Sequence, residues 1–208
     1  MTVVVIATEE QKQELLLTGW QEKAAISWTE DISNSVDADV VMDLMFDENP
    51  EVHFGFLKKL TSRLIVINDV CRYADSLPSN FTSINGWPTF LCRSVIEACC
   101  ENDELKPVAE EFFLLFNKKT EWLSTTPGFI SARVVSMIIN EAYFANMEEV
   151  SNREEIDIAM KAGTNHPYGP FEWSRIIGIK KIYGLLKKLE EMDDAYKPCD
   201  LLTKEATA

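Results

Sequence analysis

The chain has 208 residues, of which 46% are hydrophobic, and this content is enough for one or two packed domains. Its 34 acidic and 20 basic residues give a net charge of −14, which argues against a nucleic-acid partner because phosphate binding requires clustered cations. Five cysteines without CxxC spacing and only two histidines predict free thiols in a reducing cytoplasm and no metal site. No apolar run approaches about 18 residues, so we expect no membrane partner.

Short apolar runs alternate with amphipathic stretches in the first part of the chain. This alternation is typical of βαβ units on a parallel sheet, in which strands are buried on both faces. The predicted strands cover residues 2–6, 24–28, 39–46, 64–68, 81–84, 91–98 and 120–124. The predicted helices cover residues 9–17, 49–60 and 103–116.

The second part of the chain predicts helices only. Thr126 is expected to cap a helix that has Pro127 in its first position and continues to about Met147. Apolar residues occupy more than one face of this helix, so we expect more than one face to be covered. The domain boundary is therefore expected near Thr125, with domains at 1–124 and 125–208.

Two shorter helices should follow in this second part. Ser151 and Glu154 predict a capping box at the start of one helix, and Gly163 is expected to end it. Pro170 predicts the start of the next helix, after which the apolar pattern continues.

Three segments of the second part carry a resemblance to a known family. They read TPGFISAR at 126–133, NEAYFANMEEVSNREEIDIAMKAGTNHPYGPFEW at 140–173 and AYKPCDLL at 195–202. In this order they resemble the C-terminal helical domain of 3-hydroxyacyl-CoA dehydrogenases. The resemblance implies an α/β plus all-α chain, in which a truncated Rossmann-like parallel-sheet domain precedes a helical dehydrogenase C-terminal-like domain. The family's pair of helices between the second and third strands is expected to be absent, because residues 31–37 form only a short polar loop.

The dinucleotide site that this resemblance implies needs glycines after the first strand. In a G-x-G-x-x-G motif the glycines let backbone amides and a helix N-terminus approach the pyrophosphate. The three positions fall here on Ala7, Glu9 and Lys12, and Glu10 adds a second acidic side chain. One like-charge contact at about 4 Å opposes binding by about 4 kcal/mol at an effective dielectric of about 20. We therefore expect no cofactor, and NAD is implied by the resemblance alone.

The resemblance also implies a catalytic histidine that is held by a glutamate. The glutamate falls on Glu97, but the histidine position falls on Asn85, and an amide is no general base near neutral pH. We expect Glu97 to be a partly buried carboxylate bonded to Asn85 or to backbone amides. The family's substrate-facing serine falls near Val70 and its asparagine on Ala132, whereas Arg133 is retained.

Three functions remain open at this point. The leading interpretation is a relative in acyl-CoA metabolism that retains an acyl-CoA pocket without NAD-dependent catalysis. The second is an active 3-hydroxybutyryl-CoA oxidoreductase with a rearranged site, although neither His53 nor His166 is expected to replace the missing base. The third is a dimerisation or interaction module. A homodimer through the helical part is expected, because the 127–147 helix is more apolar than a monomer tolerates on its surface.

Overall fold

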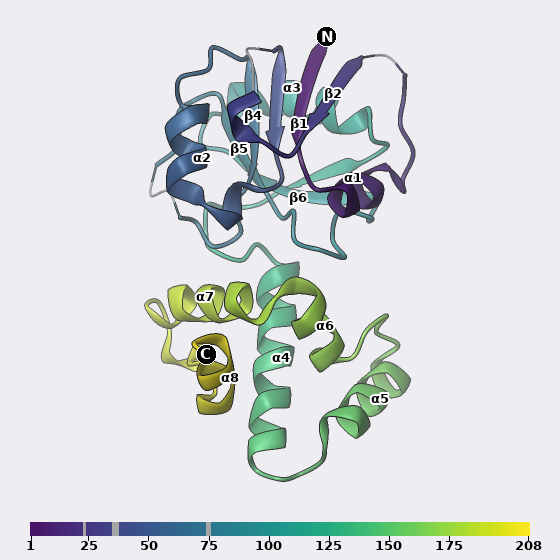
Figure 1. Ribbon diagram of the computed structural model, residues 1–208, viewed down its shortest axis with the longest axis vertical. Helices are drawn as coiled ribbons and strands as arrows, with labels where there is room; N and C mark the ends of the chain where they lie inside the picture. The colour runs from purple at the N-terminus through teal and green to yellow at the C-terminus, as the bar shows by residue number, and fades with distance from the viewer. Residues whose placement is uncertain (23, 35–37, 74–75) are drawn as a thin grey trace. The chain divides into compact units, whose positions relative to one another are not determined.

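The chain folds into two compact units, Met1–Phe129 and Ile130–Ala208, whereas the expected boundary lay near Thr125. Figure 1 shows the elements of each unit in the computed structural model. The structure describes residues 1–22, 24–34, 38–73 and 76–208. Part of the expected polar loop at 31–37 forms a single 3-10 turn, Ile32–Asn34, and residues 35–37 lie outside the described residues.

Within the described residues, seven strands of the first unit form one sheet in the order β2-β1-β3-β4-β5-β6-β7. The strands are β1 (Thr2–Ile6), β2 (Ala25–Thr29), β3 (Val40–Asp43), β4 (Leu64–Asn68), β5 (Phe81–Ile84), β6 (Val95–Cys99) and β7 (Lys119–Trp122). The Rossmann-like sheet is thus confirmed, but β5 and β6 pair antiparallel, whereas the other neighbours pair parallel. The connection at 85–94 contains turns only, which is too short for a parallel crossover of about a dozen residues.

Helices cover both faces of this sheet. Because side chains alternate between the two faces along each strand, neighbouring residues pack in different core clusters. Val3 and Val5 pack in the core cluster that includes α1 (Glu9–Leu16) and α3 (Lys106–Leu114). Val4 packs in the opposite cluster, which reaches α2 (Pro50–Leu57). The predicted helix positions are confirmed, and the parallel strands bring their carboxyl ends to one edge.

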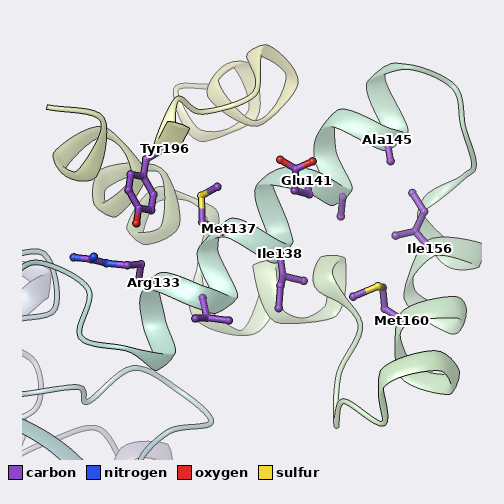
Figure 2. A pocket seen from close by; sticks show the side chains of 10 residues that line it. Arg133, Met137, Ile138, Glu141, Ala145, Ile156, Met160 and Tyr196 are labelled. Atoms are coloured by element: carbon purple, nitrogen blue, oxygen red, sulfur yellow. The ribbon is translucent and has the colours of Figure 1, made fainter. Parts of the chain in front are cut away.

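The second unit is helical, as expected, and its other helices contact α4 (Ser131–Met147). These are α5 (Arg153–Thr164), α6 (Pro170–Ile177), α7 (Ile179–Glu190) and α8 (Asp200–Ala206), with a 3-10 turn at Asp194–Tyr196. An apolar groove of about 540 Å³ lies along α4, where Figure 2 shows Ile138 on α4 facing Met160 on α5. Val134, which also lines it, is 52% exposed.

Two helix starts differ from the prediction. The helix expected from Thr126 begins at Ser131, because Gly128 (φ 86°) and Phe129 (φ 49°) adopt left-handed conformations that a helix cannot contain. The cap of α5 is Asn152 rather than the predicted Ser151, and its side chain accepts from the backbone N–H of Glu155 at 3.0 Å.

The predicted end of α5 at Gly163 is also wrong. The helix continues to Thr164 and is closed by Asn165 with φ 55°. Asparagine tolerates this left-handed conformation better than most residues, so it can end a helix where no glycine stands. The start of α6 at Pro170 is confirmed.

Asp157 of α5 fixes the start of α6 by a buried hydrogen bond. Its Oδ1 accepts from the backbone N–H of Phe171 at 2.8 Å, and the Asp157 side chain is buried. A Cβ atom at Gly169 would lie 2.3 Å from the same Oδ1. Glycine is therefore required at this position so that the carboxylate can reach the helix start.

Gly169→Ala should lower the free energy of unfolding by about 2 kcal/mol or more, because the added methyl group displaces Asp157 and breaks its bond to Phe171. The matched control is Gly163→Ala, since no atom lies within 4 Å of a Cβ there. In the control, removal of a helix-interior glycine should stabilise by about 0.5–1 kcal/mol. Urea unfolding measures both, and equal effects of the two substitutions would contradict the assignment.

Candidate functional site

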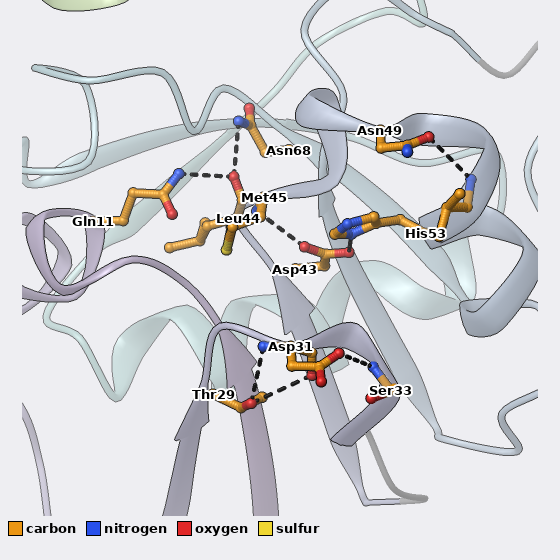
Figure 3. A network of polar contacts seen from close by, with 11 residues as sticks. Gln11, Thr29, Asp31, Ser33, Asp43, Leu44, Met45, Asn49, His53 and Asn68 are labelled. Atoms are coloured by element: carbon orange, nitrogen blue, oxygen red, sulfur yellow. Dashed lines mark hydrogen bonds and ion pairs between the residues drawn. The ribbon is translucent and has the colours of Figure 1, made fainter.

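The carboxyl edge of the sheet is the expected place for a ligand in an open α/β fold. Thr8, which caps α1, follows β1 at this edge, and Leu44 follows β3. Asn68 is the last residue of β4, and Asn85 follows β5. Figure 3 shows part of the polar network that these residues form.

Gln11 joins the N-terminus of α1 to the end of β3. Its Oε1 accepts from the backbone N–H of Thr8 at 3.0 Å, and the Thr8 hydroxyl accepts from the Gln11 N–H at 3.3 Å. The side-chain Nε2 of Gln11 donates to the carbonyl oxygen of Leu44 at 2.9 Å (Figure 3). Gln11 was not among the predicted site residues, although Thr-x-x-Gln is a recognisable capping-box pattern.

The same carbonyl oxygen connects β3 to β4 and β5. Asn68 Nδ2 donates to Leu44 O at 3.2 Å, and Asn68 Oδ1 accepts from the backbone N–H of Gly86 at 2.9 Å. A Cβ atom at Gly86 would lie 2.9 Å from the Asn68 side chain. The absence of a side chain at Gly86 thus allows the buried Asn68 amide to bridge the ends of β3 and β5.

Asn85 and Glu97, the predicted dyad positions, are brought together by the structure. Asn85 Nδ2 donates to Glu97 Oε2 at 3.0 Å, and the Asn85 N–H donates to the Glu97 carbonyl at 3.1 Å. Asn85 is buried and Glu97 half-buried, so the expected bonding of Glu97 is confirmed. The pair can orient a ligand by hydrogen bonds, but Asn85 cannot take up a proton.

The remaining predicted site residues are divided between the two units. Val70 is buried after β4, and its carbonyl oxygen accepts from the N–H of Gly128 at 2.8 Å. Ala132 and Arg133 lie in the first turn of α4 in the second unit, where Ala132 is buried. The Arg133 guanidinium lies 5.6 Å from the centre of the Tyr196 ring, a cation–π distance.

A buried acid–histidine pair at the end of β3 was not anticipated from the sequence. His53 Nδ1 lies 2.6 Å from Asp43 Oδ2, and both side chains are buried. The hydrogen bond with Asp43 raises the pKa of His53, and the negative charges of Asp47 and Glu48 raise it further. Burial raises the pKa of Asp43. The other histidine, His166, instead lies beside Trp173 in the second unit, with ring centres 5.4 Å apart.

The residues at the N-terminus of α1 do not fit the pyrophosphate of a dinucleotide. Gln11 already bonds the N-terminal backbone of this helix and crosses to Leu44. Glu9 and Glu10 project from the same first turn. Lys12 and Gln13 donate to Glu9 and lower the pKa of its carboxyl, which keeps it ionised at neutral pH. Both the space and the charge therefore oppose a phosphate group.

Other site chemistries find no support in the described part of the chain. There, no three His, Cys, Asp or Glu side chains gather in the manner of metal ligands. The five cysteines are free thiols. None of the helices that the structure describes combines the length and apolar character needed to cross a membrane.

Comparison with known proteins places these features in a family context. The family model for the 3-hydroxyacyl-CoA dehydrogenase C-terminal domain matches residues 128–208. The chain is 29% identical over 219 residues to the 3-hydroxybutyryl-CoA dehydrogenase of Bradyrhizobium diazoefficiens, covering 98% of this chain and 72% of that protein. It is 42% identical over 82 residues to the 3-hydroxyadipyl-CoA dehydrogenase of Escherichia coli, covering 38% of this chain and 17% of that protein.

A solved structure shows the same fold. The (S)-3-hydroxybutyryl-CoA dehydrogenase of Ralstonia eutropha has a TM-score of 0.73 to this chain at 17% identity, covering 99% of this chain and 93% of that one. The high coverage at low identity indicates that the fold is shared while most side chains differ.

The Asp43–His53 pair makes stability depend on pH. Because the pKa of His53 is raised on folding, its stabilisation is complete below the unfolded value of about 6.5 and is lost as pH rises through the folded value. The raised pKa of Asp43 also makes stability fall as pH rises, starting from the lower unfolded value of about 3.9. Urea unfolding should therefore show stability falling as pH rises above about 6.5, with a smaller slope in His53→Gln. A wild-type stability that rises over this range would contradict the prediction.

Proposed function

Because the chain belongs to the 3-hydroxyacyl-CoA dehydrogenase family, we propose that it binds acyl-CoA in fatty-acid metabolism without NAD-dependent catalysis. The observation that carries this proposal is the Asn85–Glu97 hydrogen bond, which stands where the family's base and its glutamate are expected. The Gln11 network at the expected phosphate site supports it independently. In both features, the side chain at the expected position, Asn85 or Gln11, is one that a dehydrogenase reaction cannot use.

Oxidation of a 3-hydroxyl group needs a base for the hydroxyl proton while hydride leaves to the nicotinamide. The Asn85 amide has no basicity for this step, and Glu97 already accepts a hydrogen bond from it. A positioned base contributes about 10²- to 10⁴-fold to a rate. What the pair retains is the ability to donate and accept hydrogen bonds, which suits binding and orientation of a thioester or hydroxyl group.

The ligand class follows from the relatives. They are named for 3-hydroxybutyryl-CoA and 3-hydroxyadipyl-CoA, so short-chain 3-hydroxyacyl-CoA esters and their 3-oxo products are the compounds to try first. The net charge of −14 opposes a polyanionic CoA at long range. Binding of the ester would therefore depend on local cations, and Arg133 is the residue that the family pattern retains. We propose a cytoplasmic location, which the free cysteines support.

An active oxidoreductase with a rearranged site is the second candidate, and one observation favours it. A carboxylate that holds a histidine is a common general-base arrangement, and Asp43 and His53 form such a pair at the carboxyl end of β3. This interpretation requires His53 Nε2, the ring nitrogen other than the one beside Asp43, to reach a substrate. It also requires a cofactor site other than the one at α1.

We predict that acetoacetyl-CoA binds saturably in calorimetry, whereas oxidation of 3-hydroxybutyryl-CoA with NAD is undetectable. Asn85→His should not restore turnover, because a histidine beside Glu97 does not open the phosphate site. Turnover above about 1 s⁻¹ would contradict the proposal. If this turnover disappears in His53→Asn but survives in Glu97→Gln, the rearranged site is established. Binding of neither ligand would leave an interaction module as the function.

We further propose a homodimer through the second unit. Val134, Ile138, Ile156 and Met160 line the groove along α4, and this surface is apolar enough to be covered by a second copy (Figure 2). Burial of about 800 Å² per subunit would be an ordinary stable interface. Arg133 and Glu141 also line the groove, so opposite charges are available to set the orientation of the two copies.

Light scattering should give twice the monomer mass of 23.7 kDa at tens of micromolar. Ile138→Glu should shift this mass towards the monomer, because a charge would be buried in the apolar groove. Ile139 is unsuitable for this purpose, since it is fully buried within the unit and its replacement would test folding. Glu148→Lys, at an exposed position beyond α4, is the control and should leave the mass doubled. A wild-type mass of one chain rules the dimer out.

A further inference from the structure

A continuous ladder of polar side chains crosses the carboxyl edge of the sheet. It begins at the N-terminus of α1, where Gln11 binds Thr8 and reaches Leu44 O. Asn68 takes the second position on Leu44 O and accepts from Gly86. One peptide bond before Gly86, Asn85 continues the ladder to Glu97 on β6. The amide groups thus link α1, β3, β4, β5 and β6 across the edge where the family's dinucleotide is expected.

We infer that the Gln11 side chain closes the phosphate site by occupying it. The hydrogen bonds of this ladder hold Gln11 in place, so that pyrophosphate cannot bind at this edge of the sheet. The inference rests on the proposal that the chain works without NAD, and it names the residue responsible. It is separate from acyl-CoA binding, which could succeed or fail without it.

The hydrogen-bond geometry distinguishes Gln11 from an ordinary helix cap. A capping box needs only an acceptor at the third helical position, and glutamate serves as well as glutamine. Gln11 uses its oxygen for that purpose and its nitrogen for Leu44 O, and a glutamate could not make the second bond. A phosphate approaching the helix end must therefore break a bond that reaches across to β3.

The ladder is tightly packed at Gly86, where there is no room for a side chain. A methyl group there would lie 2.9 to 3.0 Å from three atoms of the Asn68 side chain, which is closer than van der Waals contact allows. Asn68 would have to move, and Leu44 O would then retain Gln11 as its side-chain donor. The ladder is therefore sensitive to changes at positions that never touch Gln11.

Hydrogen exchange of side-chain amides tests the closure in the wild-type chain. The Nε2 protons of Gln11 and the Nδ2 protons of Asn68 should exchange about tenfold or more slowly than those of Gln13. Gln13 lies on the same helix, but its amide donates to the exposed Glu9 on the helix surface. Gly86→Ala should accelerate exchange at Asn68. Equal exchange rates at Gln11 and Gln13 would overturn the inference without any variant.

Binding of NAD then separates the side chain from the nearby charges. The background for this experiment is Glu9→Gln with Glu10→Gln, which removes the acidic pair and leaves Gln11 in place. In this background millimolar NAD should leave the Gln11 resonances unmoved, and the further change Gln11→Ala should increase NAD affinity about tenfold or more. Gln13→Ala is the matched control without such a gain. NAD binding with Gln11 intact, or no gain on its removal, overturns the inference, whereas acetoacetyl-CoA binding bears only on the proposed function.

Discussion

The hydrogen bond from Gln11 to Leu44 O is the interaction on which the closed carboxyl edge of the sheet depends most directly. It joins the first helix to the end of the third strand. Leu44 O also accepts from Asn68, which in turn accepts from Gly86 after β5. In an open α/β sheet these strand ends are the usual ligand edge, and backbone groups there would otherwise face a ligand or water. The side-chain amides satisfy them within the protein.

This constraint gives one physical account of several departures from a dinucleotide-binding sequence. Without glycines after β1, the helix start cannot receive a phosphate closely, and a glutamine side chain can occupy the space. Acidic residues at the first turn are then favourable, because they interact with the positive end of the helix dipole instead of repelling a ligand. An amide rather than a base at Asn85 is consistent with the same change, since the amide extends the ladder to Glu97.

The amount of structure that the sequence could predict differs between elements for physical reasons. A short apolar run rich in β-branched residues, such as 64–68, favours a buried strand, and this strand was placed correctly. The antiparallel β5–β6 pair was missed because strand direction depends on the length of the connection rather than on the pattern within the strands. The start of α4 was misplaced because Thr126 and Pro127 are good helix-start residues, while the left-handed Phe129 leaves no such signal.

The site shows the same division. The Asn85–Glu97 contact could be predicted because the family resemblance places these two residues at the positions of an interacting histidine and glutamate. Gln11 had a local signal that was not read, since Thr8-x-x-Gln11 is a capping box. The reach of its amide to Leu44 and the pairing of Asp43 with His53 depend on tertiary distances between segments far apart along the chain, and no local pattern contains them.

A crystal structure determined from crystals grown with millimolar NAD tests the closed edge most directly. The account predicts Gln11 Nε2 within hydrogen-bond distance of Leu44 O, as it is here at 2.9 Å, and no dinucleotide at the N-terminus of α1. Density for a pyrophosphate at that helix end, with the Gln11 side chain turned away from Leu44, would contradict it.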